Sequence, residues 1–389
     1  MKTVSPISDA EMARRWQLAR TVMSELGLDA LVMQAREDWM GGYVRWFTDV
    51  PAMNGYPRSV IFWADRPMTV VEMGAFGTDR SLTHDAVHRG VDRILGTPSF
   101  VSIHYTVEYD SALVVQALSE GGARRVGLLA PGALPHSLVA GIAAWGFEAV
   151  DATDALDLVK APKSPEEQEL IRLTAALQDA VFAEVCDAMR PGVTDRQIMA
   201  VAEAAGRRLG SDQGIHLGLS ARLGEASRFH GRHLQQREMA QGDHLSILIE
   251  VNGPGGIYLE IARTMVLGAA DDHLLQAFAH VKAAQDHVLG LLLPGADPAA
   301  VALAHDGFMQ ARDLPAETRL FAHGQGSEMV ERPLIRQDET LPLAEGMLMA
   351  VHPGYDDGRV FAVICDNYLI GPNGPGECLH RTEKKIFEL

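Results

Sequence analysis

Residues 250–260, EVNGPGGIYLE, decide the fold of the second half of the chain. An apolar run ends at Glu250, a turn rich in glycine and proline follows, and a second apolar run returns through Glu260. This pattern predicts a β-hairpin. The two acids are ten positions apart, so both carboxylates can lie near one point on neighbouring strands.

Three later residues complete a set of metal-ligand types. His323 lies in AHGQG, His352 in AVHPG and Cys365 in VICDN, each at the end of an apolar, strand-like run. Carboxylate, imidazole and thiolate groups are the ligands that zinc and iron take in proteins. The set predicts a metal site, and its alternative is a cluster of buried polar remnants in the core.

The composition is that of a globular enzyme-sized protein and excludes some partners. The 389 residues are 47% hydrophobic and carry a formal net charge of −17. Because phosphate binding needs clustered Lys and Arg, we expect no nucleic-acid partner. No apolar run of membrane-spanning length occurs, so we expect no membrane partner. Three scattered cysteines favour a reducing compartment, and we expect a cytoplasmic protein.

The organisation predicts two domains. Ser8 and Glu11 form a capping box before an amphipathic helix, and strand-like runs follow at 29–33, 58–63, 68–71 and 125–129. This predicts an α/β domain over residues 1–157. Ser164 and Pro165 then begin a long helix. Residues 158–389 form a second, α+β domain, in which Pro-Gly turns at 191–192 and 294–295 indicate two similar α–α–β halves.

Seven motifs of the second half together resemble one known family. They are VKAPKSPEEQELIR, PGVTD, the GD-x6-E strand, Y-x-E-I-A-R-T, HGQG, EGMLMAVHPG and CDNYLI, in order over residues 156–370. This is similar to the pita-bread fold of the creatinase, prolidase and aminopeptidase P family. The α/β first domain is typical of the creatinase/prolidase branch. The chain is identified as a divergent, creatinase-like member.

The resemblance implies a metal site that this chain has altered. The family holds two metals with Asp, Asp, His, Glu and Glu, and the matching residues here are Glu250, Glu260, His323, His352 and Cys365. Four of the five ligands differ, and Val330 stands where the family has a histidine. One subset could hold a single Zn²⁺ or Fe²⁺, namely Glu260, His323, His352 and Cys365. The alternative is a metal-free site, as in creatinase.

Further site residues follow from the same resemblance. His230 matches a histidine that contacts substrate and transfers protons, and with Glu250, Glu260 and His323 it completes the expected catalytic set. Arg263, Glu331 and Arg332 are candidates to bind substrate, with a purely structural ion-pair role as the alternative. In the first domain, a segment from Trp39 to Arg58 is rich in aromatic residues and arginines. From it we expect substrate contacts by Tyr56 and Arg58, and a homodimer.

The function expected from these residues is hydrolysis of a C–N bond in a small, polar nitrogenous compound, as in creatinase, through acid–base chemistry by His230 with Glu250 and Glu260. One alternative is an X-Pro aminopeptidase or dipeptidase with a modified metal site. A second is a lyase acting on a small zwitterion. A third is a non-catalytic binding protein, which five convergent polar groups argue against.

Overall fold

Two units divide the chain in the computed structural model, Met1–Lys160 and Ala161–Leu389. The structure describes residues 7–37, 42–53 and 55–389. The division lies at the end of helix α5 (Thr153–Lys160), whereas the boundary expected from the sequence, after residue 157, falls within that helix. In the described part of the chain, no helix is long and apolar enough to cross a membrane.

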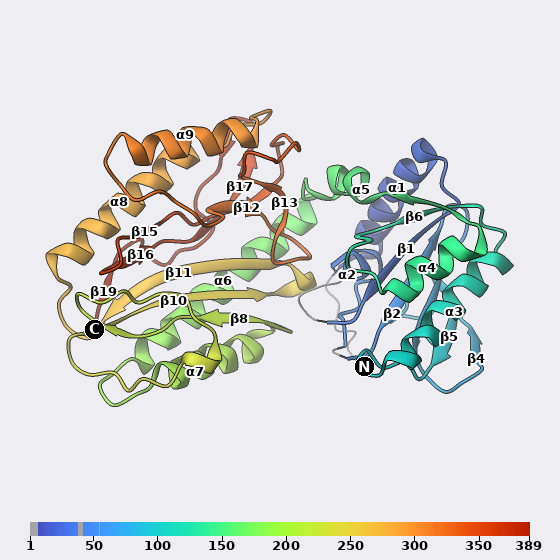
Figure 1. The fold of residues 1–389 in the computed structure, drawn as a ribbon, viewed down its shortest axis with the longest axis horizontal. Coiled ribbons are helices and arrows are strands. Elements are labelled where there is room, and N and C mark those ends of the chain that lie inside the picture. The colour runs from blue at the N-terminus through green and yellow to red at the C-terminus, as the bar shows by residue number, and fades with distance from the viewer. Residues whose placement is uncertain (1–6, 38–41, 54) are drawn as a thin grey trace. The chain divides into compact units, whose positions relative to one another are not determined.

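The first unit is built around one mixed sheet (Figure 1). Among the described residues the strand order is β4-β5-β3-β2-β1-β6-β7. In chain order its elements are α1 (Asp9–Leu26), β1 (Ala30–Ala35), α2 (Gly42–Thr48), β2 (Arg58–Trp63), β3 (Met68–Met73), β4 (Thr78–Ser81), β5 (Val91–Thr97), α3 (His104–Glu120), β6 (Arg125–Leu128), α4 (His136–Trp145), β7 (Glu148–Asp151) and α5.

Alternation along β1 explains why helices cover both faces of this sheet. Leu31 and Met33 pack into a core with α1, α2 and α5, whereas Ala30 and Val32 pack into a second core with α3 and α4. Successive strand residues point to opposite faces, so the continuous apolar run Ala30–Met33 must be buried on both. Ser8 caps α1 as predicted, since its side chain accepts from the Glu11 N–H, and the Glu11 carboxylate pairs with Arg14 and Arg15.

The aromatic segment before β2 contains a helix rather than a continuous loop. In α2, Trp46 and Phe47 are buried in the core of the first unit, which explains their presence without a ligand. Trp39 lies outside the described residues. The homodimer expected from this segment stays a prediction.

The second unit has helices on both sides of its strands (Figure 1). Its elements are α6 (Pro165–Ala188), α7 (Asp195–Leu209), β8 (Gly214–Leu217), β9 (Ala221–Arg222), η1 (Arg232–Leu234), β10 (Asp243–Asn252), η2 (Pro254–Gly256), β11 (Tyr258–Val266), α8 (Asp272–Leu289), α9 (Pro298–Gln310), β12 (Ala322–Gly324), β13 (Glu331–Leu334), β14 (Leu348–Val351), β15 (Gly354–Asp356), β16 (Phe361–Val363), β17 (Asp366–Gly371), β18 (Gly374–Pro375) and β19 (Phe387–Glu388).

Two helix pairs, each followed by strands, make up this unit, as the repeated Pro-Gly turns predict. Helices α6 and α7 precede β8–β11, and α8 and α9 precede β12–β18. Ser164 caps α6 in a complete capping box, with Pro165 at the first turn, and Thr194 caps α7 in the same way. Capping of this kind satisfies backbone N–H groups that a helix start leaves without partners.

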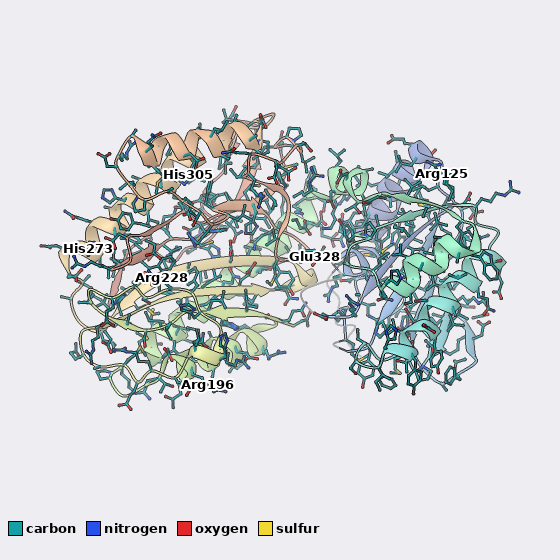
Figure 2. All side chains as sticks on the ribbon, in the orientation of Figure 1. Arg125, Arg196, Arg228, His273, His305 and Glu328 are labelled. Atoms are coloured by element: carbon teal, nitrogen blue, oxygen red, sulfur yellow. The ribbon has the colours of Figure 1, made fainter. Side chains whose placement is uncertain are left out.

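One bridge connects the sheets of the two halves. Backbone N–H and C=O groups of Ala262 in β11 and Cys365 before β17 exchange two hydrogen bonds of 3.3 Å. Buried apolar side chains pack between the strands and helices of the second unit. Arg125 and Arg196 lie on the outside of the first and second unit respectively (Figure 2). The bridge brings polar residues from both halves to one place.

Candidate metal centre

The hairpin of β10 and β11 sets the two acids side by side. Glu250 and Glu260 are direct partners in the antiparallel register, and both are buried. Side chains that face each other in this way lie on the same side of the sheet. The turn between the strands includes Gly255 at φ 74°, a backbone conformation that favours glycine. The predicted hairpin is therefore present, and it pairs the two carboxylates.

The two imidazoles come from neighbouring strands of the second half. His323 lies in β12 opposite Ala350 of β14, and His352 directly follows the end of β14. The His352 N–H donates to the Phe321 carbonyl at 2.7 Å, which continues the pairing by one residue. The two rings meet edge to face with their centroids 5.1 Å apart.

Both rings converge on one oxygen of Glu260. Its Oε1 lies 3.5 Å from His323 Nε2 and 3.4 Å from His352 Nε2. Within the described ranges these three residues offer ligand atoms that all lie within 4.8 Å of one another. One carboxylate and two imidazoles form a ligand set that catalytic zinc sites and non-haem iron sites use.

The hydrogen bond made by His323 Nδ1 determines whether Nε2, the nitrogen that faces Glu260, carries a hydrogen when the ring is neutral. Nδ1 lies 2.9 Å from the Gly324 carbonyl oxygen. A carbonyl can only accept, so Nδ1 carries a hydrogen and Nε2 of a neutral ring presents a lone pair to Glu260. Two acceptors turned toward each other require a positive charge between them. Metal-binding histidines hold their outer N–H in this way.

The charges of the partners also suit a cation. Burial lowers the pKa of His352 to about 4, against the opposing attraction of Glu260, so the ring is neutral at pH 7. Burial raises the pKa of Glu260, but positive charge on the side of His352 and His323 lowers it by more, so the group is ionised wherever that charge, a shared proton or a cation, is present. Glu260 Oε1 and His352 Nε2 are buried without a hydrogen-bond partner among the described residues. Neutral imidazole and ionised carboxylate are the forms that bind metals, so these residues fit a divalent ion.

Cys365 lies beside this cluster but not in it. Its Sγ is 3.5 Å from the backbone oxygen of Glu260 and is completely buried. Burial, together with the charges of Glu260 and Asp366, raises the pKa of the thiol well above its usual range. Since only the thiolate binds metals strongly, the geometry favours a three-residue set over the four ligands expected from the sequence.

Glu250 differs from Glu260 in its surroundings. Burial and the charge of Glu260 raise its pKa well above that of an exposed glutamate. Its Oε1 accepts a 2.9 Å hydrogen bond from the side-chain amide of Gln325. Glu250 is thus a carboxyl group that readily holds a proton next to the candidate ligands.

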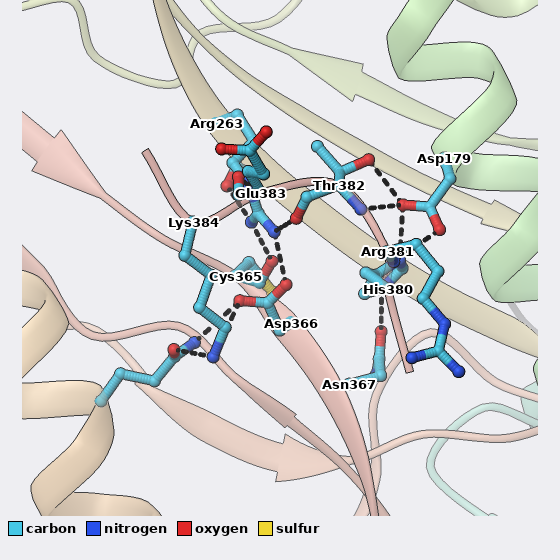
Figure 3. Close-up of polar contacts among 12 residues, drawn as sticks. Asp179, Arg263, Cys365, Asp366, Asn367, His380, Arg381, Thr382, Glu383 and Lys384 are labelled. Atoms are coloured by element: carbon cyan, nitrogen blue, oxygen red, sulfur yellow. Dashed lines mark hydrogen bonds and ion pairs between the residues drawn. The ribbon is translucent and has the colours of Figure 1, made fainter. Parts of the chain in front are cut away.

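Arg263 and His230, two further site candidates, have different environments. The guanidinium of Arg263 is fully buried and donates to Asp366 and to four backbone carbonyls, including that of Cys365 (Figure 3). These contacts favour its structural alternative. His230 is half-buried, and its carbonyl accepts from the Gly218 N–H and the Gln235 amide. No contact found in the described part of the chain connects its ring to the cluster.

The remaining candidates are engaged by other groups. Glu331 forms a buried 2.9 Å ion pair with Lys163, and Arg332 pairs with Glu339. In the first unit, Arg58 donates to Glu72 at 2.9 Å. The ring of Tyr56 lies 6.0 Å from that of Phe100. Their roles toward substrate stay predictions.

Sequence reasoning missed Gln325 and Asn367. Both are completely buried, and their side-chain amides bond to each other at 2.7 Å. Gln325 lies in the motif HGQG and Asn367 in CDNYLI, so the sequence drew attention to both segments. Their contact joins residues 42 positions apart, and no sequence pattern predicted it.

One protein-family model covers most of the second unit. The model of metallopeptidase family M24 matches residues 169–372. The chain belongs to metallopeptidase family M24, a family of hydrolases whose members usually bind divalent metals.

Known relatives include the probable dipeptidase PepE of Mycobacterium tuberculosis H37Rv, 29% identical over 222 residues. That match covers 54% of this chain and 56% of the relative, so the alignment spans only about half of either protein.

Solved structures share the fold along nearly the whole chain. The X-Pro aminopeptidase of Thermotoga maritima is 17% identical with a TM-score of 0.78, over 96% of this chain and 99% of that one. The dipeptidase PepE of Mycobacterium ulcerans is 22% identical with a TM-score of 0.75, over 98% of each chain. At these identities the likeness establishes the pita-bread fold with its N-terminal domain.

Proposed function

We propose that this protein is a metal-dependent dipeptidase that works with a single divalent ion held by Glu260, His323 and His352. The observation that carries the proposal is the convergence of both Nε2 atoms on Glu260 Oε1, with His323 oriented by the Gly324 carbonyl. A carboxylate with two imidazoles is sufficient for a catalytic zinc site, because the remaining position stays open for substrate.

In the proposed reaction the ion and Glu250 have different roles. When bound, a divalent ion polarises a carbonyl group and lowers the pKa of water. Glu250 supplies the proton transfer: it receives a proton from the attacking water and passes it to the departing amine. Its position supports this role, because Glu250 pairs with Glu260 across the hairpin and its Oε1 is held by Gln325, which sets a carboxyl group beside the candidate ligands. His230 is the second candidate for proton transfer.

The peptide substrate is proposed from the family and the names of the relatives. The relatives include a probable dipeptidase and, among structures, an Xaa-Pro dipeptidase from Bacillus anthracis. They favour the peptidase alternative over the creatinase-like reaction that the altered ligands led us to expect. X-Pro dipeptides are therefore the first substrates to test, and creatine serves as the competing probe.

The test combines ion counting with substrate assays. Protein stripped of metal is loaded separately with Zn²⁺, Mn²⁺ and Fe²⁺, and ions per chain are counted by mass spectrometry. Ala-Pro, Gly-Pro, Ala-Ala and creatine are then assayed by product release. We expect one ion per chain and cleavage of at least one dipeptide. Loss of a residue that only hydrogen-bonds to a metal ligand typically weakens ion binding by roughly 10- to 100-fold. His352→Ala removes a ligand itself and should weaken binding by more than this.

His305→Leu is the matched control. His305 is also buried, and both its ring nitrogens lack hydrogen-bond partners among the described residues, so leucine removes an imidazole without breaking such a bond (Figure 2). This variant should keep its ion. Hydrolysis of creatine by metal-free protein would instead support the creatinase-like reaction, and two tightly bound ions per chain would contradict a single-ion centre.

A further inference from the structure

A line of buried hydrogen bonds leads from Glu250 to His380. Gln325 donates through Nε2 to Glu250 Oε1 at 2.9 Å, and Asn367 donates through Nδ2 to Gln325 Oε1 at 2.7 Å. His380 Nε2 lies 3.2 Å from Asn367 Oδ1 (Figure 3). We call Gln325 and Asn367 the amide relay. Both side chains are completely excluded from solvent, so no water competes for these bonds.

The direction of the relay is fixed at its Asn367 end. The backbone N–H of Glu260 donates to the side chain of Asn367 at 2.9 Å. A backbone N–H can only donate, so the atom that it meets is the amide oxygen. The nitrogen of Asn367 must then face Gln325, and the Gln325 atom that receives this bond must be its oxygen.

The Gln325 end gives the same direction independently. Gln325 Nε2 also lies 2.9 Å from the carbonyl oxygen of Met329, which can only accept. The nitrogen of Gln325 therefore faces both Met329 and Glu250. A flip of either amide would set oxygen against oxygen or N–H against N–H inside the protein, at a cost typical of buried unsatisfied groups.

We propose that Gln325 and Asn367 are positioning residues: they hold the Glu250 carboxyl group by its Oε1, which accepts a hydrogen bond from Gln325, and leave Oε2 as the oxygen available to substrate or water. The inference rests on the proposed role of Glu250. Asn367 also holds the backbone of Glu260 through the same oxygen, so one residue sets the geometry of both acids. Amides do not titrate, so this orientation persists at every pH.

The kinetic test uses Asn367→Asp and Gln325→Met. The aspartate keeps an oxygen for the Glu260 N–H but cannot donate to Gln325, and the methionine keeps side-chain volume but cannot donate to Glu250. On the dipeptide that the wild type cleaves, kcat of each should fall by roughly 10- to 100-fold, a part of what proton-transfer catalysis contributes. KM and zinc content should stay unchanged. The double variant should be no slower than Gln325→Met alone, because the two residues act as one unit.

Thr264→Val provides the control for general loss of a buried hydrogen bond. Thr264 pairs with Ser246 on the same two strands, and their hydroxyls lie 2.8 Å apart. This variant should lose stability but not kcat. Relay variants with wild-type kcat, with additive losses, or with loss of zinc in step with kcat would overturn the inference.

Hydrogen exchange tests the hydrogen bonds of the amide relay even if no dipeptide is cleaved. Protein labelled with ¹⁵N-glutamine reports the side-chain amide of Gln325, which Gln325→Met assigns by its disappearance. In the wild type its hydrogens should exchange with solvent slowly, and Asn367→Asp should speed their exchange at least about tenfold because the relay loses a bond. Rapid exchange in the wild type would overturn the relay itself, whereas slow exchange without peptidase activity would count only against the proposed function.

Discussion

Arg263 and Asp366 form an ion pair 2.6 Å long in which both side chains are entirely excluded from solvent (Figure 3). The same guanidinium donates to the carbonyls of Cys365, Thr382 and Glu383. It therefore joins β11, the start of β17 and the segment before β19. Because Arg263 lies on the strand that carries Glu260 and binds the carbonyl of Cys365, it supports the backbone beside the candidate metal centre.

Arg263→Met should destabilise the protein by about 3–5 kcal/mol, because it leaves Asp366 charged and buried with Lys384 as a more distant partner, at 3.7 Å. Denaturation by urea, followed by fluorescence, measures the change. The exposed Arg196→Met is the matched control and should shift stability by less than about 0.5 kcal/mol. A loss below about 1 kcal/mol for Arg263→Met would show that the pair is dispensable.

Asp110 should make the stability of the first unit depend on pH. Burial raises its pKa from 3.8 to about 7, and hydrogen bonds from Ser59 and Gln34 offset only part of this shift. The folded protein thus holds this proton more tightly than the unfolded chain. The stability it contributes is fully present below about pH 4 and is lost as the pH rises through 7.

Asp110→Asn removes this titration. Its stability should therefore fall less than that of the wild type between pH 4 and pH 8, by up to roughly 4 kcal/mol. Urea denaturation at a series of pH values gives the comparison. Asp65→Asn, at a carboxylate that is 77% exposed, should leave the pH dependence as it is. Parallel curves for Asp110→Asn and the wild type would contradict the buried proton.

Cys365 should not be needed to hold the ion. Its thiol is protonated, buried and directed to the Glu260 carbonyl, outside the three-residue cluster. Cys365→Ala should bind one zinc ion per chain with affinity within about threefold of the wild type, while His352→Ala loses it. Competition with a zinc-binding dye measures both. Loss of zinc from Cys365→Ala would restore the four-ligand set expected from the sequence.

Ser164→Ala should destabilise the second unit by about 1 kcal/mol, because the Glu167 N–H at the start of α6 loses its 3.1 Å acceptor. Ser164→Thr keeps an oxygen at the cap and should cost less. Thermal unfolding of the two variants side by side distinguishes them. Equal losses would mean that the serine acts through packing rather than through its hydroxyl.

Local signals in the sequence predicted local structure well. Ser8 and Ser164 begin helices as expected, and the turn before Tyr258 closes the predicted hairpin. These features depend on neighbours a few positions away, where residue type and backbone geometry are directly coupled. The strand-like runs also indicated where the metal-ligand types lie, with Glu260 in β11, His323 in β12 and His352 directly after β14.

The remaining features depend on contacts between distant residues. The contact between Gln325 and Asn367 depends on partners from different segments. The protonated state of the Cys365 thiol depends on its burial and on the charges around it. The burial of Trp46 and Phe47 in α2 could not be separated from a ligand-binding loop, because aromatic residues serve both purposes. Sequence patterns indicate which groups are available, and packing decides how each is used.

The candidate centre draws its acids from the first half of the second unit and its imidazoles from the second half. Glu250 and Glu260 meet within one hairpin, but Glu260 meets His352 across 92 positions of chain (352 − 260). Contacts of such separation form late in folding. An ion bound by Glu260, His323 and His352 would need ligands from both halves, so its binding energy would stabilise the contact between them in the folded protein.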